Sequence, residues 1–254
     1  MSHIHLPDGV LPPLWWVIGY IVCFAVLGLM VQRVKGKDVH RRIPFVGVIA
    51  AMMLITMSVP LGIIPVHLSL AVLCGIMVGP SLGFIAVFVV NIILAMLGHG
   101  GITVVGINTL ILGSEVIIGY YLFKLLYKHI NITFAAVTST IIALLVSTTL
   151  MVGVLGATVG IAEALPGDHD NEYTEQAQAG EFQIQPEEVQ LDEGTGNLQN
   201  ALNSINYLAF SGWGAVAIIL LVGIFIESLV TGLIVNFFSK VRPDLIQLEK
   251  HSTV

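Results

Sequence analysis

The chain has 254 residues, of which 56% are hydrophobic and only 10% charged, and its formal net charge is -6. Soluble domains carry about 25% charged residues. This composition, with a mean hydropathy of +0.93, therefore excludes an ordinary soluble protein and predicts a polytopic membrane protein. No Walker A, dinucleotide-binding or HExxH pattern is present, so the sequence offers no recognised motif for nucleotide hydrolysis.

Seven apolar runs follow one another along the chain and predict an all-α bundle of about seven transmembrane helices in a single domain, 1–254. The expected helices lie at roughly 14–32, 43–63, 67–79, 82–98, 104–123, 132–162 and 206–239. A spanning helix needs about 17–25 residues, so the third and fourth runs are short, and we expect a tight pair broken at Gly79-Pro80. Gly75, Gly79 and Gly83 are spaced four apart, which suits close packing of helices.

The basic residues predict the topology. All ten Lys and Arg residues fall into three clusters, at 33–42, 124–128 and 240–250. Basic residues near the ends of spans mark the cytoplasmic side. Seven spans with the N-terminus outside and the C-terminus in the cytoplasm place every cluster inside, so we expect this arrangement in the plasma membrane.

The same topology sorts the histidines. Five of the eight are expected outside, namely His3, His5, His67, His99 and His169. The other three lie in or beside basic clusters and are interpreted as solvated surface residues, namely His40, His129 and His251.

An acidic segment separates the last two runs. Residues 163–193 hold ten acids and no Lys or Arg, interleaved with Gln, Gly and Pro, so we expect 163–205 to be a largely disordered extracytoplasmic loop. It either concentrates cations near the outer surface or serves only as a soluble spacer.

The first residues indicate a metal site, because imidazole is the commonest protein ligand for late divalent metals, and Ni²⁺ or Cu²⁺ accepts square-planar nitrogen ligation. If Met1 is retained, its amine, two backbone amides and the His3 imidazole complete the plane. If Met1 is removed, the Ser2 amine, one amide and His3 leave a fourth position open, for which His67 is the best candidate. The alternative is a short polar N-terminus that carries His by chance.

Four further polar residues are candidates for supporting roles. Glu115 and Glu227 lie within predicted spans, where an ionised side chain costs several kcal/mol unless it is paired or hydrated. We expect both past the midpoints of their helices towards the cytoplasm, acting in gating or coupling. Alternatively, each is protonated or bonded to helix backbone or to Ser and Asn neighbours. Asn108 and Asp8 are candidates for supporting the outer site.

Motifs at both ends and in the middle of the chain resemble one family. His5-Leu6-Pro7-Asp8-Gly9-Val10-Leu11-Pro12 is similar to the N-terminal His-Ile-Pro-Asp-Gly-Phe-Leu signature of the CbiM/NikM family. Matching segments follow in order at 41–44, 67–68, 98–103, 106–109, 227–232 and 241–246. The resemblance covers nearly everything except roughly 163–205. It implies a cobalt or nickel substrate-capture component of an energy-coupling-factor transporter.

The resemblance also implies a ligand set for Ni²⁺ or Co²⁺: the N-terminal amine, the signature His and a second His that opens a later helix. By motif these side chains are His5 and His67. Here Met1-Ser2-His3-Ile4 precedes His5, so either His3 takes the place beside the amine or both histidines bind. His99 stands where the family usually has Asp, and either adds a ligand or caps the turn.

The implied partners are a membrane coupling protein, two cytoplasmic ATPase subunits and, as a further candidate, a small accessory membrane protein, all within or on the lipid bilayer. No nucleic acid and no intrinsic cofactor are expected, since the metal is the substrate. Two other functions are open. A membrane metalloenzyme needs an open coordination position and a nearby carboxylate base, and outside the acidic loop Asp8 is the only acid close to the outer histidines. An ATP-independent metal channel or sensor is the second.

Overall fold

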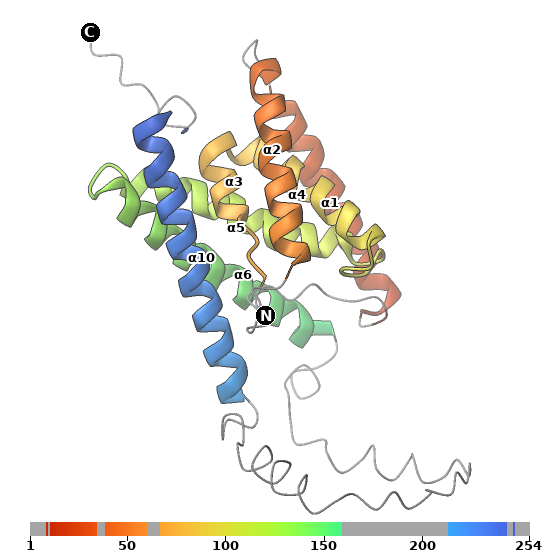
Figure 1. Ribbon diagram of the computed structural model, residues 1–254. Helices are drawn as coiled ribbons and strands as arrows, with labels where there is room; N and C mark the ends of the chain where they lie inside the picture. The colour runs from red at the N-terminus through yellow and green to blue at the C-terminus, as the bar shows by residue number, and fades with distance from the viewer. Residues whose placement is uncertain are drawn as a thin grey trace, which may run out of the picture.

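The computed structural model describes residues 9, 11–34, 39–59, 67–158, 213–242 and 246. Within 39–59 the surroundings of the side chains are described from residue 42 onward, and within 213–242 from residue 218 onward. In these stretches the regular elements are seven α-helices (Figure 1). They are α1 (Pro13–Arg33), α2 (Val39–Ser58), α3 (Ala71–Val78), α4 (Pro80–Met96), α5 (Val105–Leu126), α6 (Ile132–Thr158) and α10 (Trp213–Val241). The predicted all-α class is confirmed. The acidic loop predicted at 163–205 lies outside the described residues.

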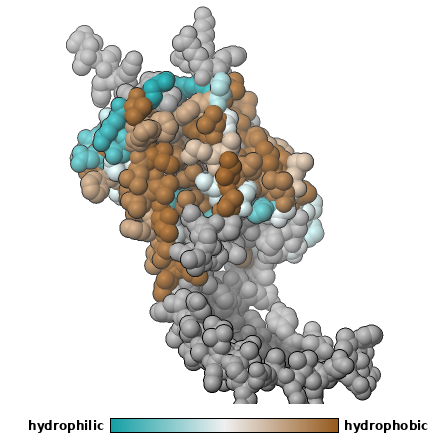
Figure 2. Space-filling model, viewed as in Figure 1, coloured by the Kyte–Doolittle hydropathy of each residue, from teal (hydrophilic) through white to brown (hydrophobic). Residues whose placement is uncertain are grey.

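The described surface is that of a membrane protein. Four helices are long and apolar enough to cross a membrane, namely Pro13–Arg33, Val105–Leu126, Ile132–Thr158 and Ile218–Val241. Large apolar side chains such as Phe24, Leu221 and Phe225 lie more than half exposed, and Figure 2 shows apolar residues over much of the described surface, with the hydrophilic ones gathered towards one end. Such a surface is favourable against lipid and unfavourable against water.

The core is organised around α5, which packs against α1, α3, α4 and α6, while α10 packs mainly against α6. All eight residues of α3 are buried. At about 1.5 Å per residue, an eight-residue helix is far too short to cross a hydrocarbon core of about 30 Å. The third predicted run, 67–79, is therefore a short internal helix preceded by a non-helical segment, 67–70, and does not span alone.

The break predicted between the third and fourth runs is confirmed. Gly79 has φ +90° and ends α3, and Pro80 begins α4. Glycine adopts positive φ without a steric penalty, and proline suits the first position of a helix because its missing N–H has no partner there. The two residues therefore end the buried helix α3 and begin α4 directly after it.

Two of the spaced glycines bring α3 and α4 against α5, as predicted. A Cβ added at Gly75 would lie 2.6 Å from the carbonyl oxygen of Val116, and one added at Gly83 would lie 2.7 Å from Cγ1 of Val116. Real Cβ atoms do not approach other atoms so closely, so both positions require the absence of a side chain. This packing places Glu115, the residue before Val116, against the start of α3.

We predict that Gly75→Ala lowers the free energy of unfolding by about 1–3 kcal/mol, because the new methyl group meets backbone that has little room to move. Unfolding of the purified protein in detergent measures the effect. Gly28→Ala in α1 is the matched control, since nothing lies within 4 Å of the added Cβ, and we expect it to be neutral or slightly stabilising. Equal destabilisation by both variants would contradict the close packing.

Candidate metal-binding site

The predicted ligands, supporting residues and gating residues divide into two groups. Met1, Ser2, His3, His5 and Asp8 lie outside the described residues. The structure places the other candidates, His67, His99, Asn108, Glu115 and Glu227. No three His, Cys, Asp or Glu side chains of the described stretches are grouped as a metal site.

His67 opens the non-helical segment 67–70 that leads into α3. Its side chain is half-buried, and the next three residues are buried. Leu70 has φ +53° and is the one non-glycine residue of the described chain with positive φ. For a branched side chain this conformation costs about 1–2 kcal/mol, so the surrounding structure must hold the segment in place.

Hydrogen bonds to Glu227 of α10 fix the backbone of this segment. Glu227 Oε2 accepts a hydrogen bond from the backbone N–H of Ser69 at 3.2 Å, and its Oε1 accepts one from the N–H of Leu70 at 3.0 Å. The N–H of Ala71 donates to Ser69 Oγ at 3.2 Å. The first N–H groups of a helix have no partner within the helix, and a carboxylate there is stabilised by the helix dipole. Glu227 therefore satisfies backbone N–H groups at the N-terminus of α3, and its partner Leu70 lies 157 residues away in sequence.

Glu115 of α5 meets the same serine from another side. Ser69 Oγ lies 2.6 Å from Oε1 of Glu227 and 3.1 Å from Oε2 of Glu115. Ser147 of α6 forms a hydrogen bond with Oε1 of Glu115. Both glutamates are 0% exposed. Two carboxyl groups and two hydroxyl groups from four parts of the fold thus form one buried cluster.

The prediction that both glutamates lie past the midpoints of their helices is wrong. Glu115 lies at the middle of Val105–Leu126, and Glu227 lies at the middle of Trp213–Val241, rather than past the midpoints. The difference arises because the helices begin and end at other residues than hydropathy indicated. Ser69 therefore lies at the level of the centres of α5 and α10, and α3 begins in the interior of the bundle.

The remaining candidates are placed differently. His99 is exposed in the turn between α4 and α5, where its backbone N–H donates to the carbonyl of Leu94 at 2.8 Å. Asn108 is buried in the first turn of α5. These positions leave both proposed roles of His99 open, as ligand or as turn residue.

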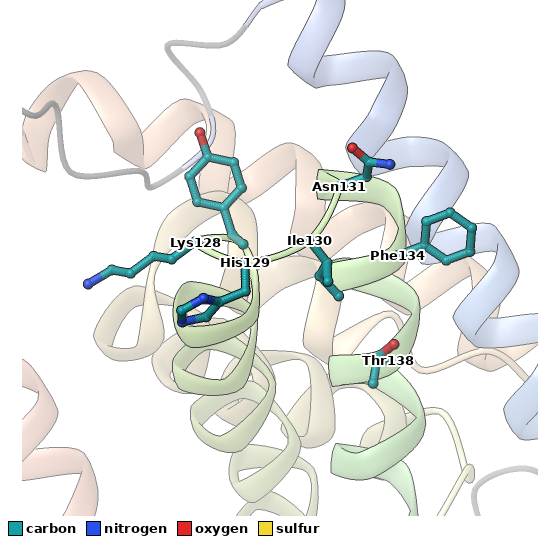
Figure 3. A pocket seen from close by; sticks show the side chains of 7 residues that line it. Lys128, His129, Ile130, Asn131, Phe134 and Thr138 are labelled. Carbon is teal, nitrogen blue, oxygen red and sulfur yellow. The ribbon is translucent and has the colours of Figure 1, made fainter.

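A separate hollow of about 680 Å³ lies at the turn from α5 to α6, among basic residues. Tyr127, Lys128, His129, Ile130, Asn131, Phe134 and Thr138 line it. Figure 3 shows these side chains spreading apart, with Lys128 and Phe134 pointing in opposite directions. They do not converge on one point, as ion ligands must. His129 is exposed, which confirms its interpretation as a surface residue.

Sequence reasoning missed Ser69 and Ser147, the residues that join the two glutamates. The available signal was weak. Ser69 lies two residues after His67, and Ser147 is one of several hydroxyl residues within the apolar run of α6. Hydroxyl groups in such runs often bond to their own helix backbone, as Thr148 does with Leu144, so position alone did not select these two.

Comparison with known proteins agrees with this architecture. The model of the CbiM family, described as the cobalt uptake substrate-specific transmembrane region, matches residues 5–245. The cobalt transport protein CbiM of Clostridium tetani is 31% identical over 134 residues, which are 50% of this chain and 56% of that protein. The chain spans about half the length of the curated relatives it matches.

Two solved structures share the fold. A truncated transition metal transporter aligns with a TM-score of 0.65 at 18% identity, over 94% of this chain and 99% of the other. A second transition metal transporter aligns with the same TM-score at 20% identity, over 94% and 93%. Because the family model matches residues 5–245, nearly the whole of this chain, the chain belongs to the CbiM family, described as the cobalt uptake substrate-specific transmembrane region.

Proposed function

We propose that this chain captures Co²⁺ or Ni²⁺ as the substrate-binding component of an ATP-driven uptake transporter. The observation that carries the proposal is the placement of His67. The imidazole that the family motif assigns as a ligand opens a segment whose backbone is fixed by Glu227 in the interior of the bundle. A ligand on an ordered segment binds more tightly because less freedom is lost when the ion arrives.

The proposed donors are nitrogen atoms. The amine of Met1 or Ser2, the backbone amides that follow, and the imidazoles of His3 or His5 and of His67 complete one shell. Late first-row divalent ions accept such ligands, whereas Mg²⁺ and Ca²⁺ prefer oxygen. Asp8, Asn108 and His99 remain candidates for supporting this shell.

The proposed orientation follows from charge. Of the described basic residues, Arg33 ends α1, Lys124 lies in the last turn of α5, and Lys240 lies in the last turn of α10. By the positive-inside rule these ends face the cytoplasm. The chain then crosses the plasma membrane several times, with its N-terminus outside, where the substrate is available.

ATP hydrolysis is assigned to partners. Because the sequence has no Walker A pattern, we propose that a membrane coupling protein and two cytoplasmic ATPase subunits drive transport, with a small accessory membrane protein as a further candidate subunit.

We predict that His67→Ala weakens Ni²⁺ binding by about tenfold or more, since one coordinating nitrogen is lost. Isothermal titration of the purified chain with Ni²⁺ measures the affinity. His129→Ala is the matched control, because that exposed imidazole lies in the α5–α6 turn, and its affinity should equal the wild type. An unchanged affinity in His67→Ala would remove this residue from the ligand set.

A second prediction concerns the amine. Residues fused ahead of Met1 by a non-cleavable tag should weaken Ni²⁺ binding, because the free amine is displaced from the histidines. The same tag fused after Val254 should have no effect. Mass spectrometry of the untagged protein identifies whether Met1 or Ser2 carries the amine. Equal affinities for the two tagged forms would count against an amine ligand.

A third prediction concerns energy coupling. Cells that produce the chain with its coupling protein and ATPase subunits should accumulate radiolabelled Co²⁺ or Ni²⁺. Replacement of the Walker A lysine in those ATPase subunits should abolish accumulation, because phosphate binding is lost. Accumulation that persists with the inactive ATPase would instead support a passive channel.

A further inference from the structure

The hydrogen atoms available to Ser69 are too few for its contacts if both glutamates are ionised. A serine hydroxyl carries one hydrogen and two lone pairs. Ser69 Oγ accepts from the N–H of Ala71 and also lies within hydrogen-bonding distance of one oxygen from each glutamate. An ionised carboxylate only accepts. One hydroxyl hydrogen makes a strong, linear hydrogen bond to only one of the two carboxyl oxygens. A full hydrogen bond at the other contact therefore needs a hydrogen on a carboxyl group.

The two distances from Ser69 Oγ indicate which glutamate carries the carboxyl hydrogen. The shorter contact, 2.6 Å to Glu227 Oε1, takes the Ser69 hydroxyl hydrogen. The longer contact, 3.1 Å to Glu115 Oε2, is then made by a carboxyl hydrogen on Glu115 that Ser69 Oγ accepts. Ser147 Oγ lies near both the other oxygen of Glu115 and the Leu144 carbonyl, the latter at 3.1 Å, and in this arrangement its hydrogen goes to the shorter contact, with Glu115. In this arrangement Ser69 uses its full capacity of one donor and two acceptors.

The partners of the two glutamates agree with the assignment. Glu227 accepts from two backbone N–H groups at the start of α3, and these can only donate, so they favour an ionised carboxylate. The hydroxyl groups of Ser69 and Ser147, which form hydrogen bonds with Glu115, can accept as well as donate, so they also suit a protonated carboxyl group. Two carboxyl groups that meet at one serine hydroxyl in a buried site repel each other when both are ionised, which favours one retained proton.

We propose that the pair holds a single proton, on Glu115, and that ionised Glu227 is the positioning residue that fixes the backbone of 67–70 and hence His67. The positioning role rests on the proposed function, whereas the location of the proton does not. The pair then presents one buried negative charge at the start of α3. A divalent ion bound by neutral imidazole gains from such a charge nearby without direct coordination.

Two isosteric substitutions test the proposal because they should behave oppositely. Glu115→Gln replaces a carboxyl O–H with an amide N–H that can also donate to Ser69, so Ni²⁺ affinity should stay close to wild type. Glu227→Gln places an amide nitrogen where an acceptor is needed, and Ni²⁺ affinity should fall by about 10- to 100-fold. Calorimetry on the full chain in detergent gives both values, and an unchanged affinity in folded Glu227→Gln overturns the positioning role.

Infrared spectroscopy of the metal-free protein tests the proton itself. The carbonyl band of a protonated carboxyl should be present in the wild type, absent in Glu115→Gln and retained in Glu227→Gln. A wild type without this band, or a band lost only in Glu227→Gln, overturns the assignment. If His67→Ala binds Ni²⁺ normally, the proposed ligand role of His67 fails while the infrared result still decides the location of the proton.

If Glu227→Gln fails to fold, Ser147→Ala provides a second test of the proton on Glu115. It removes one hydroxyl group from the interior and leaves the cap of α3 intact. If Glu115 carries the proton, its carbonyl loses a hydrogen bond and the band moves to higher frequency. An unmoved band in folded Ser147→Ala places the proton elsewhere and overturns the proposal.

Discussion

The structure depends on the need to satisfy the N-terminus of a helix that begins inside the bundle. Each polar backbone group left without a partner in an apolar interior costs several kcal/mol. The N–H groups of Ser69, Leu70 and Ala71 are bonded instead to Glu227 and to the Ser69 hydroxyl. With this cap in place, α3 can start at the centre of the protein, and the segment that carries His67 can be ordered there.

Close packing of α5 makes the cluster possible. Gly75 and Gly83 leave room for Val116 at distances that no side chain would allow, and the neighbouring Glu115 therefore reaches Ser69. A hydrogen bond requires its atoms within about 3.2 Å, so a bulkier residue at either glycine would separate the carboxyl groups from the serine. The small residues thus determine the geometry of polar groups that they do not contact themselves.

In the proposed function, nitrogen and oxygen atoms have separate tasks. Imidazole and amine nitrogens hold the ion, which favours late transition metals over hard cations. The buried carboxyl groups act through the backbone, by fixing the segment on which one imidazole lies. Partners of this kind matter to a metal site because they set the orientation of its ligands, and here the supporting residues come from α5, α6 and α10.

The sequence determined the elements, and the tertiary structure decided which of their residues meet. Apolar runs predicted the helices, Gly79-Pro80 predicted the break, and ordered motifs predicted the family, because each is a property of neighbouring residues. The eight-residue length of α3, the central position of Glu115 and Glu227, and the roles of Ser69 and Ser147 were not predictable in this way. They depend on contacts between residues up to 158 positions apart, which packing between helices sets and hydropathy does not record.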